Sequence, residues 1–251
     1  MIVTGASRGI GAAIARLAGQ RGYDVCVNYS AAGDRAEGVA AAIRDQGQRA
    51  ITVQADVSKP DDVARLFAET DSELGPVDVL VNNAGITIKM SAADGDVETI
   101  RRVIDTNLLG PIMTTREAIH RMSKARGAAG GVIVNITSIS GLYGGLPGDV
   151  IYAGTKGGLD AFTISVAKEV AAEGIRVCGI RPGLVQTEIW DHGMSQDEVD
   201  DLGKATVPMG RVGQADEIAT AALWLCSDEA SYLTATMLNV SGGRESFVRT
   251  G

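Results

Sequence analysis

Short apolar segments alternate with helix-like segments along nearly the whole chain. Such strict alternation is typical of a parallel sheet whose crossover helices cover both of its faces. It predicts an α/β protein with a doubly wound parallel sheet of about seven strands, forming one domain over residues 1–251. The expected strands are 2–3, 24–29, 50–54, 77–81, 132–136, 175–180 and 236–240. The expected helices are one ending near 20, then 35–45, 61–73, 96–121 with a break near Gly110-Pro111, 152–173 and 215–226.

Glycine-rich and polar segments stand at the carboxyl ends of several expected strands. They are Gly5–Gly11, Asp56, Asn82–Gly85, Ser138 and Pro182-Gly183. In a parallel sheet these ends meet at one edge, and ligands of such folds bind there. A convergence of this kind is hard to obtain by accident, so it predicts one functional site at that edge.

The first of these segments follows the first strand directly and opens an alanine-rich helix. Its glycines, Gly5, Gly9 and Gly11, are spaced G-x-x-x-G-x-G, not the commoner G-x-G-x-x-G. Glycines there let the backbone turn sharply and approach a pyrophosphate, which the helix N-terminus attracts through its free N–H groups. Taken alone, the same pattern is equally compatible with a tight turn between a strand and a helix.

A tyrosine and a lysine share one helix face farther along the chain, because Tyr152 and Lys156 are one turn apart. A neighbouring ammonium favours the phenolate, so Lys156 is expected to lower the tyrosine pKa from about 10 when the pair is desolvated beside a cationic cofactor. That would give a general acid/base usable near neutral pH, and Ser138 offers a hydroxyl to the same substrate oxygen. Tyr-x-x-x-Lys alone also arises by chance in ordinary amphipathic helices; the upstream serine and the glycine loop favour the catalytic interpretation.

Composition excludes several other classes of protein. The net charge of −8 and the absence of a basic stripe argue against nucleic acid as a partner. The cysteines, Cys26, Cys178 and Cys226, lie in apolar runs at unrelated spacings, which indicates buried, reduced thiols and no metal site. No apolar run is long enough to span a membrane, and no signal peptide precedes the first strand. A cytoplasmic enzyme is the expectation.

The combined motifs resemble the short-chain dehydrogenase/reductase family over nearly the whole chain, and within it the 3-oxoacyl-carrier-protein-reductase-like carbonyl reductases. Thr4–Gly11 is similar to the family's cofactor loop, Asn82–Gly85 to its fourth-strand signature, and Pro182–Thr187 to the segment that packs on the nicotinamide. The resemblance implies a Rossmann-like fold and an NADP(H)-dependent oxidoreductase, or ketoreductase. It would transfer a hydride between nicotinamide and a ketone or secondary alcohol.

The resemblance also implies roles for individual residues. Asn107, Ser138, Tyr152 and Lys156 match the catalytic tetrad: Ser138 holds the carbonyl oxygen and Tyr152 donates the proton. Lys156 lowers the tyrosine pKa and grips the nicotinamide ribose, and Asn107 holds a water. The expected cofactor-binding residues are Gly5, Ser7, Arg8, Gly9, Ile10, Gly11, Asn28, Tyr29, Ser30, Asp56, Val57, Asn83, Ala84, Gly85, Tyr152, Lys156, Pro182, Gly183, Val185 and Thr187.

The sequence says less about the substrate. A lid is expected at about 187–213, a polar and irregular stretch with several acidic residues. An acyl carrier protein is itself acidic, and Glu173 stands where the related carrier-protein reductases are expected to have a basic residue, so a role in fatty-acid elongation is disfavoured. The expected lining is fairly apolar: Ser140, Leu142, Tyr143, Leu146, Trp190 and Met194.

Two other functions remain open at this stage. One is an NAD-dependent dehydrogenase of a sugar or secondary alcohol. The other is a cofactor-sensing module without catalysis, which would be expected to lose the tyrosine or the lysine; both are present.

The choice of coenzyme is expected to be NADP(H). In a dinucleotide fold, the carboxylate that accepts the ribose 2′-hydroxyl stands at the end of the second strand. Here that end reads Val27-Asn28-Tyr29-Ser30 and has no acid. Arg8 would then reach a 2′-phosphate, and Asn28 and Ser30 would add neutral donors.

The chain is also expected to form a homotetramer. The helices 96–121 and 152–173 carry apolar residues on more than one face, for instance Leu159, Phe162, Ile164 and Val166. One face packs on the sheet and the other calls for a partner. Packing under a neighbouring loop is the alternative.

Overall fold

The computed structural model describes residues 1–187 and 195–245 of the chain. All strands of its main sheet are parallel, in the order β3-β2-β1-β4-β5-β6-β9. The predicted doubly wound parallel sheet is therefore confirmed. The strands are β1 (Ile2–Val3), β2 (Val25–Tyr29), β3 (Ala50–Gln54), β4 (Val79–Asn82), β5 (Gly131–Ile136), β6 (Ile175–Pro182) and β9 (Met237–Val240); β7 (Val185–Gln186) and β8 (Gly213–Gln214) form a separate small sheet.

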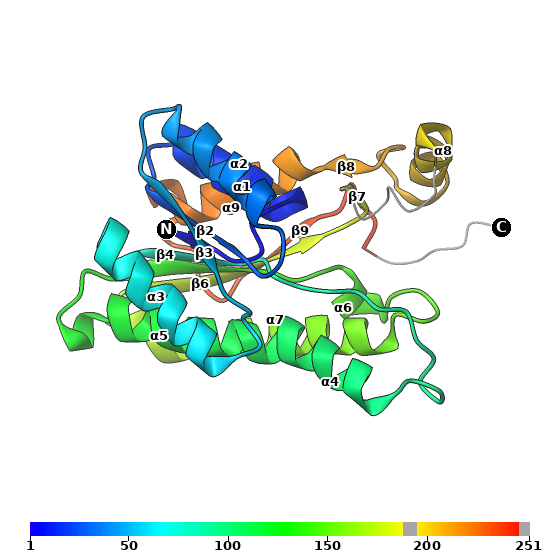
Figure 1. Cartoon of the computed structure of the whole chain (residues 1–251). Helices are drawn as coiled ribbons and strands as arrows, with labels where there is room; N and C mark the ends of the chain where they lie inside the picture. The colour runs from blue at the N-terminus through cyan, green and yellow to red at the C-terminus, as the bar shows by residue number, and fades with distance from the viewer. Residues whose placement is uncertain (188–194, 246–251) are drawn as a thin grey trace.

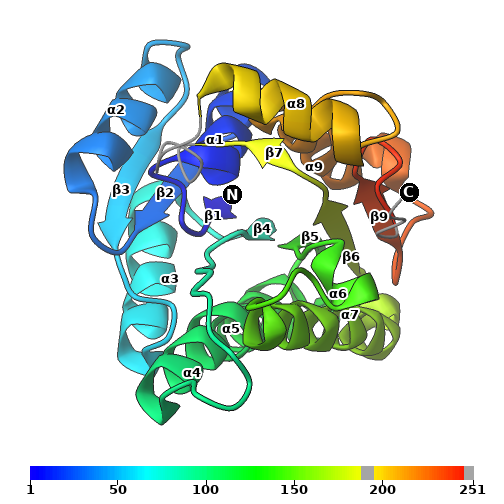
Figure 2. The same cartoon turned by 90° about the vertical axis from the view of Figure 1, so that its right-hand side faces the viewer.

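Helices cover both faces of the sheet, as Figure 1 shows. One layer contains α1 (Gly9–Gln20), α2 (Gly33–Arg44) and α9 (Ala215–Cys226). The other contains α3 (Pro60–Leu74), α4 (Val97–Ile104), α5 (Gly110–Met122) and α7 (Val150–Val170). The short α6 (Ser140–Tyr143) and α8 (Gln196–Thr206) lie at the edge formed by the strand ends (Figure 2).

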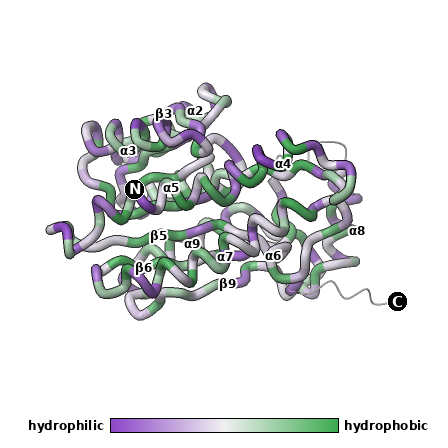
Figure 3. The backbone as a smooth tube through the Cα atoms, turned by 90° about the horizontal axis from the view of Figure 1, so that it is seen from below, coloured by the Kyte–Doolittle hydropathy of each residue, from purple (hydrophilic) through white to green (hydrophobic). Residues whose placement is uncertain are grey.

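The alternation of side chains along each strand divides the core into two. Ile2 belongs to the cluster under α3, α5 and α7, and the next residue, Val3, belongs to the cluster under α1, α2 and α9. Both side chains are fully buried. Because both faces are covered, the strands are mostly apolar, with a few polar residues such as Asn28, Asn82 and Asn135, whereas the helices alternate between apolar and polar positions (Figure 3). In the described part of the chain, no helix is long and apolar enough to cross a membrane.

The strand order places the site. The chain moves outward from β1 to β3 on one side and returns to β4 on the other, so β1 and β4 are neighbours at the switch point. Ligands of such sheets bind in the crevice outside these two strand ends. Figure 2 looks onto this edge, where the loops after β1, β4 and β5 come together.

Two expectations about local structure are wrong. The long helix is not broken at Gly110-Pro111: a π-helical turn, Asp105–Leu109, joins α4 to α5 without interruption. Pro111 has no N–H to donate within a helix. The wider π-helical turn just before it accommodates the proline, so the helix continues. Residues 187–213 are also not irregular throughout, because α8 occupies Gln196–Thr206.

Helix α8 begins at a capping box, a sequence motif formed here by Ser195 and Glu198. Ser195 accepts from the N–H of Glu198, and the Glu198 carboxylate accepts from the N–H of Ser195. Two of the free donors at the helix start are thereby satisfied. Asp197, Glu198, Asp200 and Asp201 thus lie on a capped helix.

A buried polar network ties the second helical layer to the two strands at the centre of the sheet. Asn82 of β4 donates to the side chain of Asn135 of β5 at 2.9 Å, and Asn135 donates to Thr163 of α7 at 2.8 Å. Thr114 of α5 donates to Asn82 at 2.6 Å. Each of these side chains is essentially inaccessible to water, so each bond removes a polar group that would otherwise be buried unpaired.

Removing the central amide of this network should destabilise the protein. We expect Asn135→Ala to lower the free energy of unfolding by about 1–3 kcal/mol, because partners in β4 and α7 lose a buried hydrogen bond. Urea denaturation followed by circular dichroism measures this. Gln54→Ala is the matched control, since its exposed amide donates to the Ser30 carbonyl; it should change stability by less than about 0.5 kcal/mol. Equal effects of the two variants would contradict the assigned role of the network.

Candidate active site

The glycine loop is shaped by the strand next to it. Gly5 has φ +62°, and a Cβ there would lie 2.9 Å from the Cα of Ala84. A Cβ on Gly11 would lie 2.6 Å from the Gly5 carbonyl and would also collide with the Asn83 amide. Gly5 therefore requires glycine on two grounds, backbone conformation and close approach of the loop after β4, whereas Gly11 requires it because of close approach alone.

Thr4 and Asn83 hold that loop in place. Asn83 Nδ2 donates to the carbonyls of Thr4 at 2.9 Å and Gly5 at 3.1 Å. The Thr4 hydroxyl accepts from the N–H groups of Asn83 and Ala84, each at 3.0 Å. Thr4 is not among the site residues predicted above, although it opens the loop motif. With Thr4 and Asn83 used in this way, the loop after β1 is fixed against the loop after β4.

Asn28 has a different role from the one predicted. Its Oδ1 accepts from the Gly5 N–H at 3.1 Å, and its Nδ2 donates to the carbonyls of Val53 and Ala55 at 3.2 and 3.0 Å. The residue is 1% exposed. Its amide is therefore not available to a 2′-phosphate; it braces the glycine loop against β3.

The other residues predicted near the ribose remain at the surface. Arg8 and Ser30 are exposed, and Tyr29 is partly buried beside Gly33 at the start of α2. Asp56, after β3, is turned into its own loop: its Oδ1 accepts from the N–H of Ser58 at 3.0 Å and from the Ser58 hydroxyl at 2.7 Å. The buried Val57 next to it contacts Gly110 at the start of α5.

The segment after β6 faces the glycine loop. A Cβ on Gly9 would lie 3.5 Å from Thr187 Cγ2, so the start of α1 and the end of this segment border one crevice. Gly183 is pressed against Ser241, and a Cβ there would lie 2.7 Å from the Ser241 Cα. Pro182 accepts from the Ile139 N–H at 3.1 Å, which ties the segment to the turn after Ser138. Val185 is buried.

Ser138, Tyr152 and Lys156 come together at the end of β5. The Ser138 hydroxyl lies near enough to the Tyr152 phenol to lower the tyrosine pKa. Lys156 Nζ lies 5.7 Å from the centre of the Tyr152 ring and donates to the Ile136 carbonyl at 2.9 Å. Lys156 is only 4% exposed, and this burial lowers its pKa to about 8, against which the charge of Asp160 acts.

In the protein alone, burial raises the pKa of Tyr152 above its ordinary value, and the negative charge of Asp149 adds to this. The hydroxyls of Ser138 and Thr87 act in the opposite direction. The Lys156 ammonium is directed to the backbone of β5, and the lowering of the tyrosine pKa expected beside a cationic cofactor stays a prediction. The phenol is therefore held in its protonated form.

Asn107 lies in the π-helical turn and is fully buried. Its side chain bonds the backbone of Ile86 twice: Oδ1 accepts from the N–H and Nδ2 donates to the carbonyl, both at 2.8 Å. A Cβ on Gly85 would lie 3.4 Å from Asn107 Oδ1 and 3.5 Å from Lys156 Nζ. The asparagine thus positions the loop after β4 beside the lysine. The structure places Asn107 with the other three residues of the predicted tetrad.

The predicted substrate residues are only partly brought together. Leu142 and Leu146 are exposed, Ser140 begins α6, and Tyr143 packs its ring 6.0 Å from the guanidinium carbon of Arg244. Trp190 and Met194 lie outside the described residues. The expectation that they line the site stays a prediction.

Two residues near Tyr152 were missed by the sequence analysis. The Thr87 hydroxyl lies near enough to Tyr152 to lower its pKa, and Asp149 is a buried carboxylate one helical turn before the tyrosine. Thr87 follows the Asn82–Gly85 motif by two residues, so its proximity to the strand end was a usable signal. Asp149 gave no such signal, because its burial arises from the loop that folds back at Leu146, whose N–H donates to its carboxylate at 3.1 Å.

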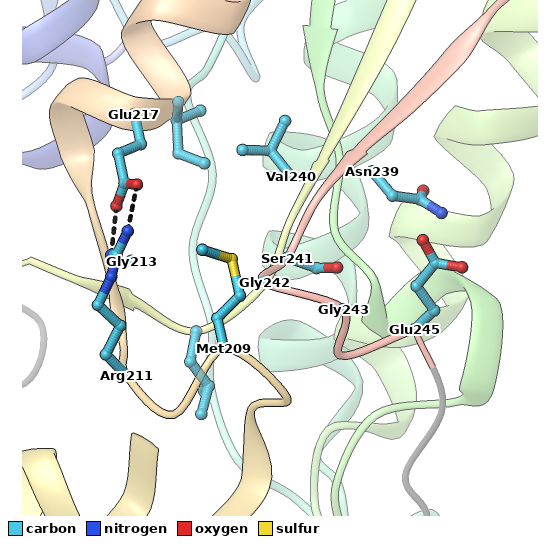
Figure 4. A pocket seen from close by; sticks show the side chains of 12 residues that line it. Met209, Arg211, Gly213, Glu217, Asn239, Val240, Ser241, Gly242, Gly243 and Glu245 are labelled. Atoms are coloured by element: carbon cyan, nitrogen blue, oxygen red, sulfur yellow. Dashed lines mark hydrogen bonds and ion pairs between the residues drawn. The ribbon is translucent and has the colours of Figure 1, made fainter. Parts of the chain in front are cut away.

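A cavity of about 320 Å³ lies behind this site and contains none of the tetrad (Figure 4). At its mouth, Arg211 and Glu217 form a two-pronged ion pair with contacts of 2.8 and 2.7 Å. It is bordered by β9, and by the Gly242-Gly243 turn that follows it. The three cysteines are free and buried, as predicted.

Comparison with known proteins agrees with this geometry. Residues 5–245 match a family model described as enoyl-(acyl carrier protein) reductase. The chain is 42% identical over 245 residues to the uncharacterized oxidoreductase YgfF of Escherichia coli K12, covering 97% of this chain and 98% of that protein. It is 38% identical over 247 residues to the 3-oxoacyl-[acyl-carrier-protein] reductase FabG of Staphylococcus epidermidis, covering 96% and 97%.

The fold is also similar to that of a solved enzyme. A double mutant of a Serratia marcescens short-chain dehydrogenase/reductase superposes with a TM-score of 0.89 at 29% identity, covering 98% of this chain and 97% of that one. The sequence match, the shared fold and the tetrad residues assembled at the switch point agree. The chain is an oxidoreductase of the short-chain dehydrogenase/reductase family.

Proposed function

We propose that this protein is an NADP(H)-dependent ketoreductase in which Tyr152 is the general acid/base. The observation that carries the proposal is the assembly of Ser138, Tyr152 and Lys156 at the sheet edge, opposite the glycine loop. The S. epidermidis relative is named as a reductase of a 3-oxoacyl group, which is also a ketone. A small-molecule carbonyl compound or its alcohol is the proposed substrate.

The residues fit a dinucleotide. Gly5 and Gly9 both have positive φ, and Gly9 opens α1 with its free N–H groups toward the crevice. Thr187 borders the same crevice from the other side. The small Gly85 leaves room beside the Lys156 ammonium, where a sugar hydroxyl would be accepted. Together these features support a pyrophosphate near α1 and a ribose near Lys156.

The bound nicotinamide supplies or accepts the hydride, and the chain's own residues handle the proton. Ser138, beside Tyr152, would orient the substrate oxygen toward the phenol. Tyr152 would donate its proton to that oxygen during reduction. Because burial raises the pKa of Tyr152, the phenol is protonated at neutral pH and is suited to act as the acid. This favours the carbonyl reductase over the alcohol dehydrogenase as the direction at neutral pH.

NADP(H) is preferred over NAD(H) in this proposal. No carboxylate stands at the end of β2, so nothing repels a 2′-phosphate there. Arg8 is exposed at the start of α1 and, within the described residues, forms no ion pair, so its guanidinium is available to the phosphate. Exposed Ser30 adds a hydroxyl, whereas Asn28 is occupied.

A homotetramer is the proposed assembly. Apolar side chains are exposed on two separate parts of the surface: Val97, Ile104 and Leu109 on α4 and the π-helical turn, and Trp224 and Tyr232 on and after α9. Two distinct apolar surfaces allow two kinds of contact between copies, as a tetramer with dihedral symmetry needs. Light scattering at micromolar concentration should give about four times the chain mass; a monomer mass would refute the assembly.

Removing the phenol hydroxyl should abolish turnover and spare binding. We expect Tyr152→Phe to lower kcat with a broad panel of ketones by at least about a hundredfold, because the proton donor is lost. The Kd for NADPH, measured by fluorescence titration, should stay within a few-fold of wild type. Tyr232→Phe is the control and should be fully active, since it keeps the aromatic ring and removes a hydroxyl before the start of β9, at the opposite end of the sheet from the tetrad. If Tyr152→Phe keeps activity within a few-fold, the assigned role is wrong; tight NADPH binding by the wild type without turnover would favour the cofactor-sensing alternative.

The coenzyme preference can be measured with one good ketone. We expect a higher kcat/KM with NADPH than with NADH, and Arg8→Ala should lower the NADPH value by about tenfold, the effect of one charge-assisted hydrogen bond, with little change for NADH. Ser30→Asp should move the preference toward NADH by placing a carboxylate at the end of β2. Preference of the wild type for NADH would contradict the proposal and favour the NAD-dependent dehydrogenase.

A further inference from the structure

A buried ion pair between Asp160 and Arg181 lies on the same face of α7 as Tyr152 and Lys156. Tyr152, Lys156 and Asp160 follow one another at intervals of one helical turn, so they lie on one face. Asp160 is 6% exposed, and its Oδ2 accepts from Arg181 Nε of β6 at 2.8 Å. Its other oxygen is buried and has no hydrogen-bond partner within the described residues. A carboxylate is rarely buried next to a catalytic residue without a reason.

The surroundings fix this pair in position. A Cβ on Gly141 would lie 3.2 Å from Asp160 Oδ2 and 2.9 Å from the Gly157 nitrogen, so the turn after Ser138 rests directly on the pair. Arg181 immediately precedes Pro182-Gly183, and its Nη1 donates to Asn239 of β9 at 3.4 Å. The pair therefore joins α7, β6 and β9 one turn away from Lys156.

Lys156 needs a negatively charged neighbour to keep its ammonium protonated, because burial removes the ammonium from water. In the described structure its Nζ donates only to the Ile136 carbonyl, and burial lowers its pKa to about 8. Among the described residues, the charged or titratable groups facing it are Asp160 and Tyr152 on α7 and, beyond Asp160, Arg181 of β6. From the loop after β4 and the π-helical turn come Gly85 and the uncharged Asn107.

We propose that Asp160, held by Arg181, is a positioning residue that keeps Lys156 protonated and thereby sets the alkaline limit of cofactor binding and turnover. This inference rests on the proposed function, in which the charged Lys156 grips the nicotinamide ribose. Lys156 contributes to binding while it is charged, so that contribution is present at neutral pH and is lost as the pH rises through its pKa near 8. The negative charge of Asp160 raises the pKa of Lys156, so the loss of cofactor binding occurs at a higher pH than it would without Asp160.

The test is the pH dependence of NADP⁺ binding, measured as Kd by fluorescence or calorimetry between about pH 7 and 10, where the lysine titrates. Asp160→Asn keeps an oxygen acceptor for Arg181 and removes the charge. We expect its weakening of binding to begin at a pH lower by about one unit than in the wild type. Asp160→Glu restores the charge and should restore the profile.

Arg181→Gln provides the opposite change. It removes a positive charge next to Asp160, so Lys156 should keep its proton to higher pH and the loss of binding should move upward. If Asp160→Asn does not fold, the pH dependence of NADP⁺ binding by Arg181→Gln tests the proposal instead. A merely structural ion pair would give lower stability in both variants with no movement of the profile, and that result, or movement of both in the same direction, would overturn the proposal.

The chain offers a matched control pair. Asp71 of α3 accepts from Arg121 Nε at 2.6 Å, and its second oxygen is likewise buried without a partner. Asp71→Asn should lower the melting temperature and leave the pH profile unchanged. A shift as large as that of Asp160→Asn would contradict a specific effect on Lys156.

Failure of this inference can be separated from failure of the proposed function. Lys156→Arg stays charged over this pH range and should lose the alkaline decline altogether. If Lys156→Ala binds NADP⁺ as the wild type does at every pH, the proposed ribose contact is wrong. If Lys156→Arg lacks the decline but Asp160→Asn titrates like the wild type, only the role of Asp160 is wrong.

Discussion

Removal of the Tyr152–Lys156 pair from water is the constraint on which the site depends. Burial penalises the charged form of each group, so it raises the pKa of the phenol and lowers that of the ammonium. In the protein alone, both effects favour neutral side chains. A proton-transfer pair therefore needs charge supplied by its surroundings: Asp160 on the helix for Lys156, and the positive nicotinamide ring of the oxidised cofactor for Tyr152.

The fold supplies the rigid frame for this arrangement. The loop after β4 fits into the glycine loop so closely that Cβ atoms on Gly5 or Gly11 would collide with it. Asn107 holds the same loop from the other side through the Ile86 backbone. The buried amides of Asn82 and Asn135 fix the strands below. Side chains of the site thus come from elements whose spacing is determined by backbone contact, which limits how far the reacting groups can drift.

The sequence was sufficient for the fold class and for the gathering of the glycine loop and Ser138 at one edge, because strand alternation and strand-end motifs depend on local pattern. Asn107, by contrast, was assigned only through the family resemblance. The sequence was not sufficient where an outcome depends on which partner a side chain finds. Asn28 was expected to face a phosphate, but it bonds Gly5 in the glycine loop and Val53 and Ala55 at the end of β3, which are two other parts of the chain. The π-helical turn and the burial of Asp149 and Asp160 are likewise set by packing between distant elements.

The direction of the Lys156 ammonium could not be predicted for the same reason. Spacing placed Lys156 on the face of Tyr152, but the direction of its ammonium is decided by the Ile136 carbonyl of β5. By contrast, the capping box of α8 was present in the sequence as Ser195 and Glu198, so that helix could have been predicted from local pattern.

The central claim is that the Tyr152 phenol is held protonated in the free protein and becomes acidic only next to bound NADP⁺. Tyrosine labelled with ¹³C at Cζ reports the ionisation directly by NMR, and Tyr152→Phe assigns the signal. The account predicts that the Tyr152 pKa lies above the ordinary value of about 10 in the free protein and falls when NADP⁺ binds. A phenol that is already acidic in the free protein, or whose ionisation does not change on NADP⁺ binding, would contradict it.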